Sequence, residues 1–250
     1  MKLQDKIVVV TGLSSGIGVA VVKAFAEAGA KVVLNYHINQ AGGEAALKSV
    51  RQLSPESILV QADLSTEAGV DRLFDAAVSQ FGRIDILVNN AGIGTDKVPF
   101  MEADFLDLKE MIDTDLTGLM LASQRAAKIM LNQPGGGKIL NTSSVRGWQF
   151  GGRAPVYAGC KAAVNNFTSS FAKMVAPKIA VNAVAPGYVR TRSYDGMTDD
   201  EIDSWLNATL LKRFIKAEEI ADAFLFLARN DAMTGQVIYV DAGFTCQIKV

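Results

Sequence analysis

Tyr157 and Lys161 stand four residues apart in a segment with a helical pattern, and this spacing gives them a chemical use. Residues i and i+4 share one face of a helix, so the Lys161 ammonium can lie beside the Tyr157 phenol. The ordinary pKa of a phenol is about 10, and a neighbouring cation favours its ionised form. A phenol with this neighbour can act as a general acid and base near neutral pH. The pair is weak evidence by itself, because the chain has five tyrosines.

Composition argues against several other chemistries. The 250-residue chain has one histidine, His37, so a histidine-based triad or metal centre would depend on that residue alone. Its two cysteines, Cys160 and Cys246, lack the paired spacing of a metal site or a disulfide framework, and we expect no metal. With 25 Lys and Arg against 26 Asp and Glu, the net charge is −1, which speaks against a nucleic-acid partner.

The hydropathy pattern gives no sign of a membrane segment or a targeting signal. No stretch approaches the roughly 18–20 uninterrupted apolar residues of a membrane span, so we expect no membrane partner. The first residues, MKLQDKIVVVTG, pass directly into a predicted strand and leave no room for a signal peptide. Together with the low cysteine count, this favours a cytoplasmic location.

A glycine-rich turn follows the first predicted strand. The sequence TGLSSGIG, residues 11–18, separates that strand from a helix. Glycines let the backbone turn tightly and approach a pyrophosphate, and a helix N-terminus offers free N–H groups with a partial positive charge. The pattern therefore favours dinucleotide binding; the alternative is a tight strand–helix turn with no ligand.

Two further polar clusters follow the third and fourth predicted strands, Asp63-Leu64 and Asn89-Asn90-Ala91-Gly92. In a doubly wound sheet such positions converge on the ligand crevice. The Asp63 carboxylate could accept a hydrogen bond from an adenine amino group, and the small residues would let a flat ring lie close. The alternative is local, with Asp63 capping a helix and Asn89-Asn90 forming a turn.

Short β-branched runs alternate with longer helical patterns along almost the whole chain. The expected strands are Ile7–Thr11, Lys31–Tyr36, Ser57–Ala62, Ile84–Asn89, Lys138–Thr142, Ile179–Val184 and Gln236–Val240. The expected helices are Ile17–Ala28, Gln40–Gln52, Glu67–Phe81, Asp104–Leu131, Pro155–Val175 and Ala217–Ala228. This alternation predicts a single α/β domain over residues 1–250, a Rossmann-type doubly wound parallel sheet of about seven strands with helices on both faces. Residues 188–212 interrupt the pattern and are expected to form a substrate lid.

In order and spacing, these pieces resemble the short-chain dehydrogenase/reductase family over essentially the whole chain. The resemblance rests on Thr11–Gly18, Asp63-Leu64, Asn89–Gly92, Ser144, Tyr157, Lys161, Pro186-Gly187 and Thr191. Ser144 precedes Tyr157 by thirteen residues, a spacing common in that family, which selects Ser144 over its neighbour Ser143.

The resemblance implies hydride transfer between a nicotinamide and the carbon of a carbonyl or secondary alcohol. Tyr157 would act as general acid and base, Lys161 would lower the pKa of Tyr157 and hold the nicotinamide ribose, and Ser144 would hydrogen-bond the reacting oxygen. The implied cofactor-binding residues are Gly12, Ser14, Ser15, Gly16, Ile17, Gly18, Tyr36, His37, Asp63, Leu64, Asn90, Ala91, Gly92, Tyr157, Lys161, Pro186, Gly187, Val189 and Thr191.

Asp115 departs from the family pattern. The family usually has Asn in an N-x-x-G pattern at this point, and this chain reads Asp115-Leu116-Thr117-Gly118. If that Asn acts mainly through its backbone carbonyl, Asp115 can replace it as a catalytic residue, and a carboxylate near Lys161 would raise the pKa of the lysine. The other interpretation is a helix aspartate with no catalytic role.

The end of the second predicted strand, Asn35-Tyr36-His37, bears on the choice of cofactor. Relatives that prefer NAD tend to carry an acid where Tyr36 stands, because it bonds the ribose 2′-OH and repels a 2′-phosphate. Its absence favours NADP(H), with His37 or Ser15 meeting the phosphate. Neither position is Arg or Lys, so NAD(H) remains an alternative.

These inferences predict an NAD(P)(H)-dependent oxidoreductase that acts on a small molecule. The candidate substrates are a sugar, as in glucose dehydrogenases, a 3-oxoacyl thioester, or a hydrophobic ketone, which Trp148, Phe150 and Trp205 would favour. The alternative is a nucleotide-binding scaffold or sensor that lost catalysis, and Asp115 is its only support. The resemblance also implies a homotetramer or homodimer built from the helices near Asp104–Leu131 and Pro155–Val175.

Overall fold

Seven parallel strands form one sheet in the computed structural model, which describes residues 1–13, 16–94, 96–148, 154–190, 196 and 198–246. The strands are β1 (Ile7–Val10), β2 (Lys31–Tyr36), β3 (Ile58–Gln61), β4 (Ile86–Asn89), β5 (Gly137–Thr142), β6 (Ile179–Pro186) and β7 (Val237–Val240). Their order is β3-β2-β1-β4-β5-β6-β7, and each neighbouring pair is parallel. The order reverses between β1 and β4, and ligands of open α/β sheets bind beside the carboxyl ends at such a point. The expected Rossmann-type sheet is confirmed.

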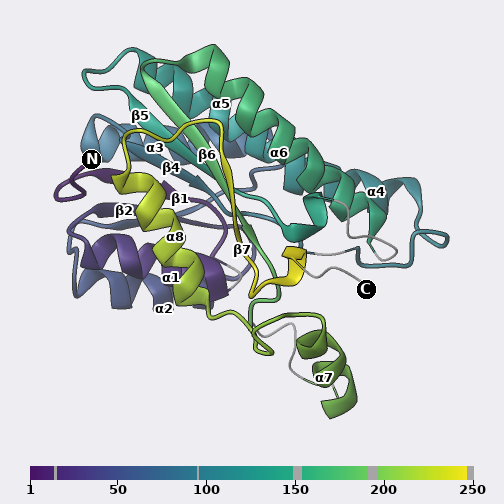
Figure 1. Cartoon of the computed structure of the whole chain (residues 1–250). Helices are drawn as coiled ribbons and strands as arrows, with labels where there is room; N and C mark the ends of the chain where they lie inside the picture. Colours follow the sequence, from purple (N-terminus) through teal and green to yellow (C-terminus); the bar gives the residue numbers. More distant parts are fainter. Residues whose placement is uncertain (14–15, 95, 149–153, 191–195, 197, 247–250) are drawn as a thin grey trace.

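Helices cover both faces of this sheet (Figure 1). The helices are α1 (Gly16–Glu27), α2 (Gln40–Arg51), α3 (Glu67–Phe81), α4 (Phe105–Ile112), α5 (Gly118–Leu131), α6 (Pro155–Val175), α7 (Asp199–Asn207) and α8 (Ala217–Arg229). One core packs β1 against α1, α2 and α8, and the other packs it against α3, α5 and α6. Successive β1 side chains alternate between the cores, because strand side chains point to opposite faces. None of the helices in the described part of the chain combines the length and apolar character of a membrane span.

Two expected segments differ from the structure. The long helix expected over Asp104–Leu131 is divided into α4, a π-helical turn η1 (Asp113–Thr117) and α5. At the junction, a Cβ on Gly118 would lie 2.5 Å from the carbonyl oxygen of Leu64, so the glycine permits a close backbone approach. The segment 188–212 includes a helix, α7, which the sequence patterns did not predict.

Candidate active site

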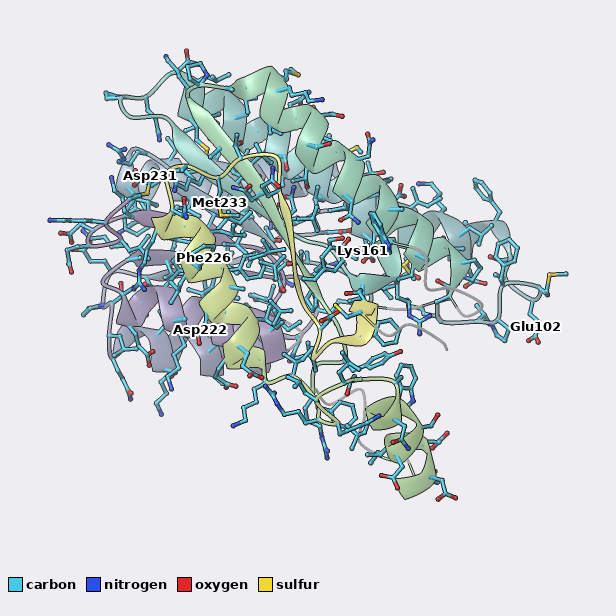
Figure 2. The ribbon with its side chains drawn as sticks, viewed as in Figure 1. Glu102, Lys161, Asp222, Phe226, Asp231 and Met233 are labelled. Atoms are coloured by element: carbon cyan, nitrogen blue, oxygen red, sulfur yellow. The ribbon has the colours of Figure 1, made fainter. Side chains whose placement is uncertain are left out.

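Lys161 is a buried cation where α6 passes the carboxyl ends of the central strands (Figure 2). Its Nζ lies 3.1 Å from Asp115 Oδ1 and 5.4 Å from the centre of the Tyr157 ring, and it donates to the carbonyl oxygen of Thr142 at 3.3 Å. Burial opposes the charged ammonium, but the negative charges of Tyr157 and Asp115 outweigh it and raise the pKa of Lys161. The predicted juxtaposition of ammonium and phenol ring is therefore present.

Asp115 is fully buried on the π-helical turn, a kind of irregularity that is frequent at functional sites. Its Oδ2 accepts the backbone N–H of Ile93 at 2.8 Å, and its Oδ1 faces Lys161. A Cβ on Gly92 would lie 2.7 Å from that Oδ1, so the glycine makes room for the carboxylate. The predicted contact between an acid at this position and Lys161 is present; its part in catalysis stays a prediction.

The two adjacent serines differ in what their hydroxyls contact. The Ser143 hydroxyl bonds to α6: its Oγ donates to Asn165 Oδ1 at 2.5 Å and lies 3.3 Å from the Lys161 carbonyl oxygen. Ser144 instead accepts the N–H of Arg146 at 3.2 Å and caps the short 3-10 turn η2 (Val145–Gly147). Among the described residues the Ser144 hydroxyl accepts this one hydrogen bond and donates none, and its role toward a substrate oxygen stays a prediction.

The glycine turn is fastened to the end of β4. Thr11 Oγ1 accepts the N–H groups of Asn90 and Ala91, and Asn90 Nδ2 donates to the carbonyl oxygens of Thr11 and Gly12. Gly12 has φ +72°, and a Cβ on it would lie 2.5 Å from Ala91 Cα. Both donor hydrogens of the Asn90 amide are thus used within the protein, so this amide shapes the turn.

Asn35 supports the same turn, a role that its place at the end of the second predicted strand did not indicate. It is 2% exposed near the end of β2, where its Oδ1 accepts the Gly12 N–H at 3.2 Å. Its Nδ2 donates to the carbonyl oxygens of Tyr36 and Ala62 at 3.2 and 3.1 Å. An amide inside an otherwise apolar buried strand was the signal, since a buried polar group needs partners.

Asp63, His37 and Tyr36 lie at the ends of β2 and β3. Asp63 does not cap α3, because Thr66 is the N-cap; its Oδ1 accepts from Ser65 N and Oγ, and its Oδ2 lies 3.9 Å from His37 Nε2. Burial opposes ionisation, but the hydrogen bonds from Ser65 and the charge of His37 lower the pKa of Asp63 below its usual value. His37 is exposed, whereas Tyr36 is 9% exposed.

The end of β6 carries the other predicted cofactor residues. Gly187 follows Pro186, and a Cβ on it would lie 2.8 Å from Asp241 Cα. Val189 is buried and forms a bridge with Ile215. At the glycine turn, α1 begins with Gly16, Ile17 and the buried Gly18. Leu64, which follows β3, is also buried. The predicted residues Ser14, Ser15 and Thr191 lie outside the described residues.

Aromatic side chains join the region of α7 to the C-terminal segment. The Tyr188 ring meets Trp205 of α7 edge-on at 4.3 Å between centroids and Phe244 at 5.1 Å. Trp148 is 63% exposed and approaches Tyr239 at 6.5 Å, while Phe150 lies outside the described residues. Trp205 therefore packs against protein, and Trp148 is the more open of the two tryptophans.

Known proteins resemble this chain along nearly its full length. A family model described as enoyl-(acyl carrier protein) reductase matches residues 12–245. An uncharacterized oxidoreductase of Methylorubrum extorquens is 39% identical, covering 97% of this chain and 98% of the relative. A 3-oxoacyl-[acyl-carrier-protein] reductase of Synechocystis is 36% identical, covering 96% and 97%.

Solved structures agree with this relationship. A short-chain dehydrogenase/reductase from Serratia marcescens superposes with a TM-score of 0.90 at 33% identity, covering 98% of this chain and all of that one. A short-chain dehydrogenase from Burkholderia cenocepacia in complex with NADP gives 0.89 at 28% identity, with the same coverage. The chain therefore belongs to the short-chain dehydrogenase/reductase family of NAD(P)-dependent oxidoreductases.

Proposed function

We propose that Tyr157 is the general acid and base of a reaction that interconverts a carbonyl compound and a secondary alcohol. The observation that carries this proposal is Lys161, a buried cation held between Asp115 and the Tyr157 ring at the carboxyl edge of the sheet. A cation in a buried site stabilises the anion that forms when the phenol gives up its proton. Lys161 and Ser144 then complete the site, and Asp115 holds Lys161 in place.

The residues present fit a dinucleotide cofactor. The glycine turn leads into α1, whose first turn contains no acidic residue, so its N–H groups and positive dipole end suit a pyrophosphate. After β3, Asp63 Oδ2 lies near His37 and could accept a hydrogen bond from the adenine amino group of such a cofactor. The nicotinamide of such a cofactor supplies or accepts the hydride when bound.

The chain's own groups handle the oxygen and its proton. In reduction, the Ser144 hydroxyl donates a hydrogen bond to the carbonyl oxygen, and Tyr157 Oη transfers its proton to that oxygen. The Lys161 ammonium stabilises the resulting phenolate, which is reprotonated from solvent. In oxidation the phenolate removes the alcohol proton, so each direction is balanced by one proton exchanged with water.

Replacing the phenol oxygen tests this assignment. We expect Tyr157→Phe to lower kcat by about 10²–10⁴-fold, the usual contribution of general acid–base catalysis, and to leave dinucleotide binding unchanged. The measurement is turnover by NADPH absorbance together with NADPH binding by fluorescence titration. Turnover near that of the unaltered protein would exclude Tyr157 as the acid. A nucleotide-binding scaffold or sensor would bind NADPH equally and show no turnover to lose.

NADP(H) is the favoured cofactor in this proposal. Support comes from the absence of an acid at Tyr36, from the exposed ring of His37, and from the solved relative in complex with NADP. A comparison of kcat/KM for NADPH and NADH with one substrate measures the preference. A ratio in favour of NADH would reverse the assignment.

The substrate is a small carbonyl compound or alcohol of one of three classes. They are a sugar, a 3-oxoacyl thioester and a hydrophobic ketone, the last supported by the exposed Trp148 beyond Ser144. A turnover panel of D-glucose, acetoacetyl-CoA, 2,3-butanedione and acetophenone, each with both cofactors, separates these classes. The class with the highest kcat/KM identifies the substrate type.

Several larger-scale features belong to the same proposal. The chain acts as one domain in which residues 188–212, of which 191–195 and 197 lie outside the described residues, close over the substrate. Support comes from the position of this segment directly after β6, at the carboxyl edge of the sheet where ligands bind. Exposed apolar side chains on α4 and α6, among them Phe105 and Met174, support a homotetramer or homodimer. The cytoplasmic location is supported by the low cysteine count. Hydrogen exchange of residues 198–212 with and without NADPH tests the lid, and light scattering during gel filtration tests the oligomer.

A further inference from the structure

Helix α6, which carries Tyr157 and Lys161, begins without a cap from its own sequence. Its N-cap residue Ala154 has φ +56° and offers no side-chain acceptor, and Pro155 at the first helical position has no N–H. The first backbone donors that need acceptors are therefore those of Val156 and Tyr157. Such groups are normally satisfied by a Ser, Thr, Asp or Asn at the N-cap.

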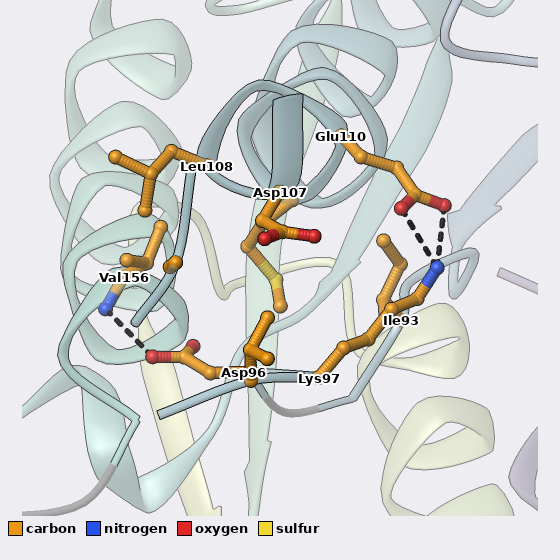
Figure 3. Close-up of a pocket in the computed structure, with 10 residues that line it drawn as sticks. Ile93, Asp96, Lys97, Asp107, Leu108, Glu110 and Val156 are labelled. Carbon is orange, nitrogen blue, oxygen red and sulfur yellow. Dashed lines mark hydrogen bonds and ion pairs between the residues drawn. The ribbon is translucent and has the colours of Figure 1, made fainter. Parts of the chain in front are cut away.

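Asp96 supplies both missing acceptors from a different part of the chain. Its Oδ1 accepts the N–H of Tyr157 at 3.0 Å and its Oδ2 accepts that of Val156 at 3.4 Å, across about sixty positions of sequence. Figure 3 shows the carboxylate of Asp96 directed at the first turn of α6. A carboxylate at this end of a helix also interacts favourably with the helix dipole.

The loop that carries Asp96 is itself held on two sides. On one side, the N–H of Ile93 donates to Asp115 Oδ2 at 2.8 Å. On the other, Lys97 Nζ bonds both carboxylate oxygens of Glu110 on α4 at 2.6 and 2.7 Å (Figure 3). Asp115 also pairs with Lys161, so two carboxylates connect this one loop to the lysine and to the backbone of the tyrosine.

We propose that Asp96 is a positioning residue for the reaction, acting through the backbone of Tyr157. By capping α6 from the loop after β4, it fixes the first turn of the helix and therefore the place of the phenol relative to Ser144. The loop begins at Gly92, beside the dinucleotide crevice, so the two sides of the site are connected through this carboxylate. This inference rests on the proposed role of Tyr157.

Removal of the carboxylate tests the idea. In Asp96→Ala we expect kcat to fall at least about tenfold, because small misplacements of reacting groups are costly, while NADPH affinity changes less than about twofold. Hydrogen exchange of residues 154–160 should become faster in the same variant. Asp96→Asn keeps one acceptor oxygen, and Asn is a good capping residue, so we expect its kcat to lie within about threefold of that of the unaltered protein. This variant also keeps the proposal testable if Asp96→Ala fails to fold. The assays use the panel substrate with the highest turnover.

Asp104→Ala is the matched control. Asp104 is also a carboxylate that accepts two first-turn N–H groups, those of Leu106 and Asp107, but on α4. We expect a similar loss of helix-end protection there with kcat unchanged. An equal fall of kcat in both alanine variants, or full kcat in Asp96→Ala with fast exchange at 154–160, would overturn the proposal. Full activity of Tyr157→Phe would instead remove the proposed function, whatever the Asp96 variants show.

Discussion

Two buried lysines are tied to opposite ends of β5, and their surroundings differ. Lys138, near the start of the strand, is 4% exposed; its Nζ donates to Asn230 O at 2.5 Å, approaches Leu227 O at 3.4 Å and pairs with Asp231 Oδ1 at 2.8 Å. An ammonium has three hydrogens, so these contacts use its full capacity. Lys161, at the other end, has Thr142 O and Asp115 as its oxygen partners within the described residues. One of its three hydrogens therefore has no oxygen partner in the part of the chain that the structure describes.

The carboxylates opposite the two lysines differ as well. Asp115 is fully buried, whereas the side chain of Asp231 is 70% exposed. Asp231 follows the end of α8 and is labelled in Figure 2. Loss of Lys161 would leave a buried charge without its partner, while loss of Lys138 would leave a carboxylate that water can solvate. Lys138 therefore has a full set of oxygen partners in the protein, whereas the proposed function gives the third hydrogen of Lys161 to a ligand.

Exchanging each lysine for methionine gives the largest expected contrast. We expect Lys161→Met to lower kcat by roughly 10²-fold or more, because the Tyr157 phenolate loses its stabilising cation. Lys138→Met should keep kcat within about twofold and lower the free energy of unfolding by about 1–3 kcal/mol, since the carbonyl oxygens at the end of α8 lose a charged donor. The measurements are turnover with NADPH and urea unfolding followed by circular dichroism.

Lys161→Met also leaves the buried Asp115 carboxylate without its cation, so we expect this variant to lose stability as well as activity. The double variant Lys161→Met/Asp115→Asn removes that buried charge and serves as the control; it should regain stability and stay inactive. If Lys138→Met lost activity as severely while still folded, the two lysines would not have separate tasks.

Asp115→Asn sharpens the contrast between the two lysines, because it removes the charge of the carboxylate beside Lys161 and leaves the surroundings of Lys138 unchanged. The amide oxygen can still accept the Ile93 N–H, so we expect measurable turnover, within about tenfold of the original. In this variant one of the negative charges that raise the pKa of Lys161 is gone, while burial still lowers it, so we expect the pKa of Lys161 to fall. Because the lysine must be charged to act, the alkaline limb of the kcat–pH profile should move to lower pH. Complete inactivation would show that the acid itself is required.

The sequence predicted the sheet and most of its helices because their signals are local. Apolar β-branched runs indicate buried parallel strands, and α3 and α6 begin and end at the predicted residues. The division of Asp104–Leu131 was missed because a π-helical turn preserves the helical hydrophobic pattern on both sides of the interruption. Helix α7 was missed although Thr198 and Glu201 form a capping box, a signal that the sequence did contain.

At the site, spacing along one helix predicted the contact between Tyr157 and Lys161, whereas contacts across the fold were harder to infer. The position of Asp115 against Lys161 was expected through resemblance alone. The bond from the Tyr157 N–H to Asp96 joins the start of α6 to a loop about sixty residues earlier in the chain, and no local pattern encodes it. The indirect signal was the missing cap: Ala154-Pro155 offers no acceptor, so a helix starting there must find one elsewhere.

Asp231→Asn gives the smallest expected effect and tests the amino end of the sheet alone. Hydrogen bonds from Lys138 and from the N-terminal ammonium lower the pKa of Asp231 to about 2, from an ordinary 3.8. A lowered pKa means that this carboxylate stabilises the folded state above about pH 4 and that the contribution disappears as the pH falls through about 2. Since the side chain is largely exposed, solvent screening limits the effect to less than about 1 kcal/mol. Urea unfolding at pH 6 should therefore separate the two proteins slightly, and acid should remove the difference. A difference in kcat between the two proteins at pH 6 would contradict the assignment of separate tasks to the two ends of β5.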